Sequence, residues 1–410
     1  MMRNITIFLI LACLLSPFVD HRIGFIFLGA LVVIGALGAN KIKLPRGWYG
    51  LMVVILPLAI FISWLYGVLL GLVNGNEPEF VISNFFGLAF YPAFYGLLAS
   101  RITSHQIVRC ILFASMVYFA YGAWLLLESI ISGAFLIGLA SSISDFRIIY
   151  LPGFLYMTPF IALGIFQSIG VSTQKRDHFI ISSLPTWLKG GKFLLAMLAV
   201  FIFVPMSKGF IAILIALIFI FIFLILWSCI NKPKLQYFIL LSIFIFLLFF
   251  LINSEYMELI TNSFSDQEGS NTVRAEQFGY IENELTFIGS GLGAVLRSGY
   301  IRSPEAPYGF ELSFLNLVHK LGWACIPLFL SYFLPIGYGL KLIFCRREHD
   351  ILAGAFIIGV IGFIIPGYGN PLLFASNIIL FHCLGLLLVY QHSCEAYASK
   401  CNENYIIKLP

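Results

Sequence analysis

Six charged residues have side chains that could bind an anion or transfer a proton next to it. Five are basic and one is a carboxylate that stands just before a long apolar stretch; they are Arg147, Lys208, Arg274, Arg297, Arg302 and Glu311. Guanidinium groups hold phosphate oxygens through paired hydrogen bonds, and a lysine adds a point charge. The basic residues therefore predict a site for a diphosphate, which they could also stabilise as a leaving group without a metal ion.

Glu311 is the candidate general base. Glu311, Leu315, Val318 and Gly322 are spaced as one stripe of a helix, which predicts a carboxylate over an apolar face that is directed at the helix bundle. A carboxylate in such a place can take a proton from a reacting hydroxyl. The alternative is an acidic residue favoured by the dipole of a helix N-terminus, and residue chemistry alone leaves both interpretations open.

Other polar features favour packing over chemistry. For His319 and His382 we favour packed roles, because His382 lies deep in an apolar segment without an obvious carboxylate partner. The run Gly289-x-Gly291-x-Gly293 is weak evidence for a phosphate cradle, since no strand precedes it, and a nucleotide-binding fold is excluded. No pair of the eight cysteines has metal-ligand spacing, so a structural zinc site is not expected. We expect no cofactor of another kind.

Composition defines the setting of these residues. Of 410 residues, 60% are hydrophobic and 10% are charged, against about 25% charged in a soluble domain. Soluble enzymes, disordered scaffolds and nucleic-acid binders are excluded. The long apolar runs predict an all-α, polytopic membrane protein, since helices satisfy their own backbone hydrogen bonds in lipid.

Apolar runs of roughly 20 residues predict twelve membrane spans. They cover approximately 5–19, 22–39, 51–73, 81–99, 106–127, 149–168, 188–206, 209–229, 235–252, 321–344, 351–366 and 371–390. With the N-terminus in the cytoplasm, only seven of the 24 basic residues fall on the outer side, and only five of the 19 acidic residues fall inside. Both termini are therefore expected in the cytoplasm.

One loop differs from the other connections. The spans divide the chain into residues 1–252 with nine helices, a large outer loop over 253–320, and residues 321–410 with three helices and a cytoplasmic tail. Within the loop, the pattern predicts a helix from Val273 to Leu285, turns at the three glycines, and a second helix from Phe310 to Lys320. A connection of this length between membrane helices usually carries function.

Basic residues on the outer side are unexpected, because Lys and Arg usually gather in cytoplasmic loops. For Arg22 we favour contact with lipid phosphates or snorkelling to the interface. For Lys208, Arg274 and Arg147 we favour the anion site. A lipid diphosphate fits, because its chain stays in the bilayer while its head group meets these side chains.

At these residues the chain resembles the superfamily of bacterial O-antigen polymerases and O-antigen ligases. About twelve spans with one late outer loop are similar to the family topology. Ser207-Lys208-Gly209 is similar to its Ser-Arg-Gly element, with Lys in place of Arg, and Arg274 with the glycine run follows the order of its loop motifs. Glu311 stands where ligases have a histidine, which favours a polymerase over a ligase.

The resemblance implies a glycosyltransferase of C-type architecture in the bacterial inner membrane, with its active site facing the periplasm. It would transfer a growing glycan from undecaprenyl diphosphate to a repeat unit on the same lipid, without a metal. Arg274, Lys208 and Arg147 would hold the donor diphosphate, with help from Arg297 or Arg302, and Glu311 would be the base. Expected partners are lipid-linked oligosaccharides, membrane lipids and a protein that regulates chain length, with no nucleic acid.

Two alternatives remain open at this point. One is a ligase that moves finished glycan to the lipid A core. The other is a flippase or another transporter of lipid-linked oligosaccharides, although transporters usually have paired halves and charges along a path through the membrane. Here the charges gather at one face and in one loop.

Overall fold

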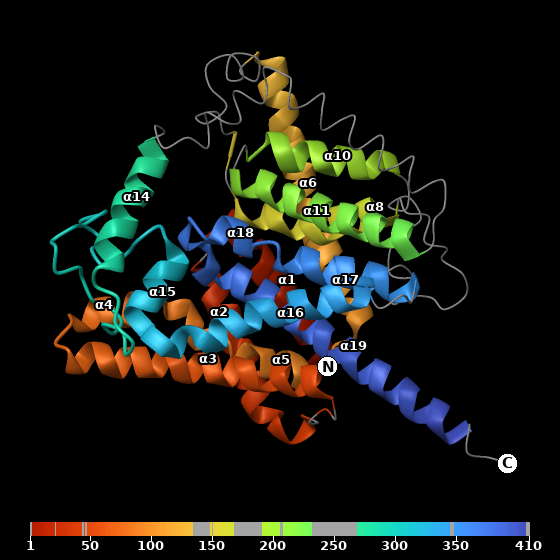
Figure 1. The fold of residues 1–410 in the computed structure, drawn as a ribbon, viewed down its shortest axis with the longest axis horizontal. Helices are drawn as coiled ribbons and strands as arrows, with labels where there is room; N and C mark the ends of the chain where they lie inside the picture. Colours follow the sequence, from red (N-terminus) through yellow and green to blue (C-terminus); the bar gives the residue numbers. More distant parts are fainter. Residues whose placement is uncertain are drawn as a thin grey trace.

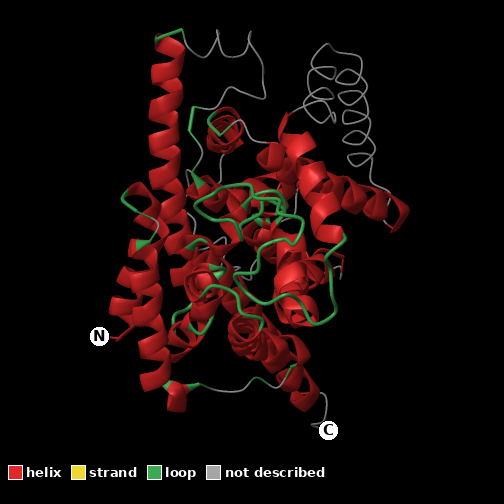
Figure 2. Cartoon of the chain, turned by 90° about the vertical axis from the view of Figure 1, so that its left-hand side faces the viewer, coloured by secondary structure: helices red, strands yellow, loops and turns green. Residues whose placement is uncertain are grey.

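The computed structural model describes residues 2–20, 22–42, 45, 47–133, 148–149, 151–167, 191–205, 208–231, 269–344 and 348–406. Within these ranges the chain is all-helical, with connecting loops and no strand (Figures 1 and 2). The first half contains α1 (Met2–Leu15), η1 (Ser16–Phe18), α2 (Ile23–Leu37), η2 (Ala39–Lys41), α3 (Trp48–Val73), α4 (Pro78–Ser83), η3 (Phe86–Phe90), α5 (Ala93–Ala99), α6 (Ser104–Ile131), η4 (Pro152–Met157) and α8 (Thr158–Gln167). The second half contains α10 (Gly191–Phe203), α11 (Lys208–Asn231), α14 (Gly269–Glu282), α15 (Ser313–Leu321), η6 (Gly322–Cys325), α16 (Ile326–Phe344), α17 (Glu348–Ile361), α18 (Ile364–Gly367), η7 (Pro371–Phe374) and α19 (Ser376–Ile406).

Five helical stretches in the described ranges are long and apolar enough to cross a membrane, which supports the expected class of all-α membrane protein. They are Trp48–Val73, Ser104–Ile131, Gly209–Trp227, Ser313–Phe344 and Ser376–Glu395. Five shorter apolar stretches accompany them: Met2–Phe18, Ile23–Leu37, Phe86–Ala99, Pro152–Gln167 and Ile351–Gly367. The expected span 235–252 lies outside the described residues, and the number of twelve stays a prediction.

Helix α19 is the centre of the bundle. Its apolar stretch is 78% buried, against 33–44% for the other four long stretches, and it contacts α1, α2, α3, α5, α16 and α17. Helix α16 packs against both α17 and α3, and Figure 1 shows it running near both. From Ser376 to Val389 every residue of α19 is buried. The mostly apolar sequence of this part agrees with its position, because a helix surrounded by other helices has no polar face.

Glycines allow the closest helix contacts in the bundle. A Cβ atom at Gly96 of α5 would lie 2.0 Å from the Leu31 carbonyl oxygen of α2, and one at Gly35 would lie 2.7 Å from the Gly96 nitrogen. Gly339 and Gly354 bring α16 and α17 together in the same way. Small residues at helix interfaces are typical of membrane proteins, where van der Waals packing drives association.

Several expected spans are interrupted rather than continuous. The expected span 81–99 contains part of α4, then η3 and α5, because Phe85 has a φ of 52° and Pro92 precedes α5. The 3-10 turn η4 forms the first part of the expected span 149–168, and η7 forms the start of 371–390. Hydropathy measures only whether a segment is apolar, so it does not detect such breaks.

The loop helices are close to their expected positions. Helix α14 covers Gly269–Glu282, against an expected 273–285, and α15 covers Ser313–Leu321, against an expected 310–320. Between them, Gly289, Gly291 and Gly293 all have a positive φ, as the expected turns require. Residues 253–268 of the loop lie outside the described ranges.

The glycine run docks the loop onto α3 and α15 through main-chain atoms. The Leu292 N–H donates to the Gly67 carbonyl in α3, at 2.9 Å, and the Gly291 N–H donates to the Lys320 carbonyl, also at 2.9 Å. A Cβ at Gly291 would lie 2.4 Å from the Gly71 nitrogen. A side chain at Gly291 in the loop or at Gly71 in α3 would therefore prevent the two main chains from coming this close.

Substitution of Gly291 tests the importance of this contact. Gly291→Ala should lower the free energy of unfolding by about 3 kcal/mol, because it adds a steric clash to the strain of a positive φ. Gly299→Ala is the matched control, since Gly299 has nearly the same φ of 77° and a Cβ atom there would have nothing within 4 Å. It should cost only about 1 kcal/mol. Thermal midpoints of the purified full chains in detergent measure both; equal midpoints would contradict the docking role of Gly291.

Candidate functional site

Glu311 lies between two arginines that are distant in the chain. Its Oε2 atom is 3.2 Å from Nε of Arg274, and its Oε1 atom forms an ion pair with Nη2 of Arg302. The three side chains are 21%, 31% and 38% exposed for Glu311, Arg274 and Arg302, so solvent reaches all of them. Two guanidinium groups and one carboxylate leave an excess of one positive charge within this charged trio, which favours an incoming anion.

Helix α14 positions both the backbone and the side chain of Glu311. Arg274 and Gln277 are three residues apart on this helix, and Gln277 Oε1 accepts the Glu311 N–H at 3.1 Å. Gln277 is fully buried, and its Nε2 atom has no hydrogen-bond partner in the described part of the chain. Gln277 was not among the residues expected from the sequence, although its position one turn after Arg274 was a usable signal.

The expected helical stripe through Glu311 is wrong. Helix α15 begins at Ser313, after Leu312 with a non-helical ψ of 76°, and it ends before Gly322, whose φ is 55°. The Ser313 N–H donates to the Tyr368 carbonyl at 3.1 Å instead of continuing a helix backwards. Glu311 therefore lies outside the helix and faces guanidinium groups rather than an apolar surface.

The connection between α18 and η7 forms another wall of the site. The Ser313 hydroxyl donates to the Asn370 carbonyl at 2.9 Å. A Cβ at Gly369 would lie 3.2 Å from Nε of Arg274, so the absence of a side chain there lets the guanidinium lie against the main chain. No sequence signal identified Gly369, since this contact joins positions 95 residues apart.

Lys208 begins a helix that packs against α18, and Arg147 lies next to a segment that contacts the turn before this helix. Lys208 is the first residue of α11, which packs against α18; a Cβ at the next residue, Gly209, would lie 2.5 Å from Cβ of Pro366. The Ile148 N–H donates to the Val204 carbonyl, so the chain next to Arg147 lies beside the turn that leads to α11. Arg147 itself and the side chain of Lys208 lie outside what the structure describes.

Arg297 and Arg302 differ in their surroundings. Both side chains are exposed, but only that of Arg302 forms an ion pair with Glu311. The contact described for Arg297 is from its backbone N–H, which donates to Oε2 of Glu284 at 3.0 Å. Among the contacts described for Arg297, none involves Glu311. The sequence left Arg297 and Arg302 as equal alternatives for the arginine that assists at the anion site. The ion pair with Glu311 favours Arg302.

The glycine run is not an anion cradle. Three consecutive amide groups donate to main-chain carbonyls: Ser290 N–H to His319, Gly291 N–H to Lys320 and Leu292 N–H to Gly67. Amides that already donate to the protein are not available to a phosphate. The run therefore positions the loop, as its contacts with α3 indicate.

His319 and Lys320 are buried beneath the same loop. Lys320 Nζ donates to the Ala294 carbonyl and lies 5.0 Å from the centre of the Phe310 ring. His319 Nε2 is 3.3 Å from the Ser290 hydroxyl. Both residues have an exposed fraction of 0%, which agrees with the packing role favoured for His319 and leaves Lys320 no access to a soluble anion.

His382 has partners for both ring nitrogens. Its Nε2 atom lies 3.0 Å from the Ser331 carbonyl, which can only accept, so this nitrogen carries the proton. The Tyr91 hydroxyl lies 2.8 Å from Nδ1 and can donate to it. A neutral, fully hydrogen-bonded imidazole needs no carboxylate partner, in agreement with the packed role.

Comparison with known proteins adds no family to these observations. No protein-family model matches the chain, and neither a curated protein nor a solved structure matches it. The resemblance to polymerases and ligases therefore depends on the sequence features given above, and the function must be argued from the charged trio.

Ion pairs that solvent can reach contribute about 0–1 kcal/mol to stability. Arg302→Gln should therefore change the thermal midpoint very little, and no more than Arg297→Gln, because the main-chain contacts of Gln277 and Ser313 hold Glu311 in place. Thermal unfolding of the two full-length variants in the same detergent measures this. A loss as large as that expected for Gly291→Ala would mean that the trio is a structural element instead.

Proposed function

We propose that the chain is a membrane glycosyltransferase that polymerises an O-antigen or another surface polysaccharide. The observation that carries the proposal is the position of Glu311 between Arg274 and Arg302 in a solvent-accessible site. One candidate base and two anion-binding side chains, contributed by separate parts of the loop, match the needs of glycosyl transfer from a lipid diphosphate.

In the proposed reaction, the donor is a growing glycan on undecaprenyl diphosphate and the acceptor is one repeat unit on the same lipid. Glu311 takes the proton of an acceptor hydroxyl as its oxygen attacks the anomeric carbon of the donor. The bond between that carbon and the diphosphate oxygen breaks, and the diphosphate leaves with the electron pair. Inversion at the anomeric carbon follows from this single displacement.

The arginines stabilise the charge that develops on the leaving group. Arg274 and Arg302 are placed to contact the diphosphate beside Glu311. Lys208 and Arg147 join them in the proposal, since α11 packs against α18, which leads to the connection that touches Arg274, and the chain next to Arg147 contacts the turn before α11. Arg297 is not assigned to the diphosphate, because its described contacts lie away from Glu311.

The proposal includes a location for the protein. The charge bias of the loops supports an inner-membrane protein with about twelve spans, both termini in the cytoplasm and the charged trio facing the periplasm. This arrangement is the C-type glycosyltransferase architecture expected above. A lipid-linked donor could then reach the site from the outer leaflet while its head group meets the arginines.

Surface lipopolysaccharide from a strain that lacks the gene tests the proposal. A polymerase predicts core that carries a single repeat unit and no ladder on a gel. Bare core would instead indicate a ligase or a flippase, and a normal ladder would remove the O-antigen role. For a flippase, reconstituted protein would move lipid-linked repeats across a bilayer without release of undecaprenyl diphosphate.

The same strain can test Glu311. Glu311→Gln removes the base and should slow chain growth by about 10²–10⁴-fold, which leaves single repeat units while the protein remains in the membrane. Glu305→Gln is the matched control, because Glu305 is an exposed carboxylate in the same loop. A ladder of wild-type length from Glu311→Gln would remove this residue from the mechanism.

A second pair of variants tests the leaving-group role. Arg302→Gln should reduce chain growth by about 10²-fold or more, since one charge that stabilises the diphosphate is lost. Arg297→Gln should keep near-normal ladders, although it removes the same charge from the same loop. Ladder profiles at matched membrane levels of protein measure the difference, and equal losses would contradict the assignment of Arg302.

A further inference from the structure

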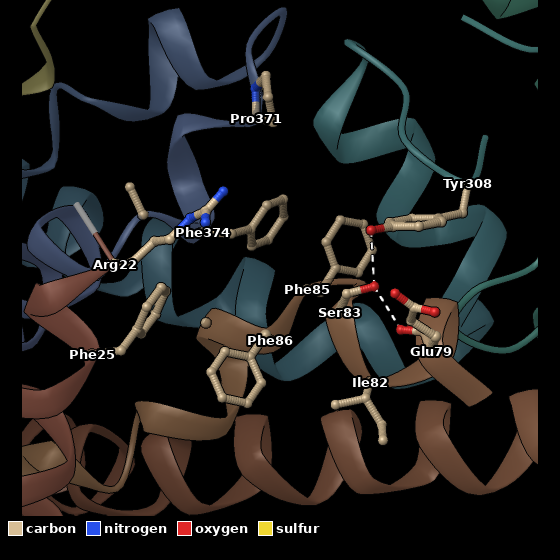
Figure 3. A pocket seen from close by; sticks show the side chains of 12 residues that line it. Arg22, Phe25, Glu79, Ile82, Ser83, Phe85, Phe86, Tyr308, Pro371 and Phe374 are labelled. Carbon is tan, nitrogen blue, oxygen red and sulfur yellow. Dashed lines mark hydrogen bonds between the residues drawn. The ribbon is translucent and has the colours of Figure 1, made fainter. Parts of the chain in front are cut away.

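A hollow of about 790 Å³ is lined in part by the outer loop and by η7, which adjoin segments of the charged trio in the chain. Its walls come from the start of α2, from α4 and η3, from the outer loop and from η7. They include Arg22, Phe25, Glu79, Ser83, Phe86, Tyr308 and Phe374. Figure 3 shows Arg22 and Glu79 on opposite sides, with aromatic rings between them. The volume lies within the range of about 300–1,000 Å³ that is usual for small-molecule sites.

The lining combines aromatic faces with polar groups of several kinds. The hydroxyl groups of Ser83 and Tyr308 are 2.8 Å apart and hydrogen bond to each other, and the Tyr308 ring centre lies 5.2 Å from that of Phe80. Arg22 supplies donors and Glu79 supplies acceptors across the hollow. Arg22 and Glu79 are both exposed, so a ligand in the hollow can reach them.

Two segments that line the hollow also continue to the charged trio. Tyr308 precedes Glu311 by three residues in the same loop. Pro371, another lining residue, follows Asn370, whose carbonyl accepts from the Ser313 hydroxyl. The hollow and the charged trio are therefore built by neighbouring stretches of the same two segments.

The mixture of groups distinguishes between classes of ligand. A phosphate would meet the negative charge of Glu79 as well as the positive charge of Arg22. A hydrocarbon chain would cover the charged groups of Glu79 and Arg22 without offering them hydrogen bonds, which is unfavourable. A sugar has apolar ring faces for the aromatic side chains and hydroxyl groups that both donate and accept, so it uses the whole lining.

We propose that this hollow is a saccharide-binding site, which holds sugar residues of a lipid-linked glycan next to Glu311. The identity of the glycan as the transferred substrate rests on the proposed function; the binding of sugar by these residues does not. In this arrangement Arg22 and Glu79 contact hydroxyl groups of one sugar unit, and Phe86 lies against a ring face. Arg22 thus acts on the glycan rather than on the phosphates of membrane lipids.

Site-specific photocrosslinking in the producing strain tests the proposal. The photoreactive residue p-benzoylphenylalanine replaces Phe86, which is 38% exposed and lines the hollow. The control places it at Trp124, a 67% exposed residue of α6 that is not among the lining residues. After irradiation, we expect a periodate-sensitive carbohydrate adduct on the full-length protein at position 86 and none at 124.

Second-site variants test the polar contacts. Combined with the probe at position 86, Arg22→Gln or Glu79→Gln should weaken carbohydrate labelling by about tenfold, because each removes a charged hydrogen-bond partner. Glu128→Gln is the matched control, since Glu128 is an exposed carboxylate of α6 that does not line the hollow. It should leave labelling unchanged.

Two results would overturn the saccharide site. One is an adduct at position 86 whose mass corresponds to phospholipid without sugar, and the other is equal carbohydrate labelling at positions 86 and 124. Crosslinking does not need turnover, so it can be repeated with Glu311→Gln. A carbohydrate adduct in a strain whose ladder does not depend on this gene would support the saccharide site and contradict the polymerase function.

Discussion

Direct main-chain contact between the loop and the bundle is the constraint on which the site depends. The Leu292 amide reaches the Gly67 carbonyl of α3, and the Gly291 amide reaches the end of α15. This approach needs glycine on both surfaces, because a methyl group at Gly71 would lie 2.4 Å from the Leu292 carbonyl. The position of the glycine run against the bundle is therefore fixed. The segment that carries Arg302 and Glu311 follows this run in the chain.

The charged trio is held by its neighbours more than by its own attraction. Gln277 and Ser313 fix the main chain around Glu311. The pair with Arg302, the most exposed of the three side chains, is weak, whereas the facing Nε of Arg274 and Oε2 of Glu311 are buried atoms. In the proposed reaction this weakness is useful. An arriving diphosphate competes with Glu311 for the guanidinium groups, so the carboxylate can turn to the acceptor hydroxyl when the donor is in place. Substrate binding and activation of the base would then be coupled through Arg274 and Arg302.

Local patterns in the sequence predicted local structure well. The apolar composition indicated the helical class, and the positions of the loop helices and glycine turns were close, because each depends on residues that are neighbours in the chain. The meeting of Arg274, Arg302 and Glu311 could not be derived, since it depends on how α14 and α15 pack. The continuous stripe from Glu311 to Gly322 failed because the Ser313 amide finds an acceptor at Tyr368, which lies far along the chain. The hollow at Arg22 was missed for the same reason.

Docking through main-chain atoms also affects how such a protein can diverge. A hydrogen bond between an amide and a carbonyl does not depend on the side chain of either residue, so most positions of the loop can change without loss of its attachment. The positions that must persist are those where a side chain would intervene, such as Gly67 and Gly71 in α3 and Gly289, Gly291 and Gly293 in the loop. Distant relatives would then share this spacing of glycines, and little overall identity, as the mark of common descent.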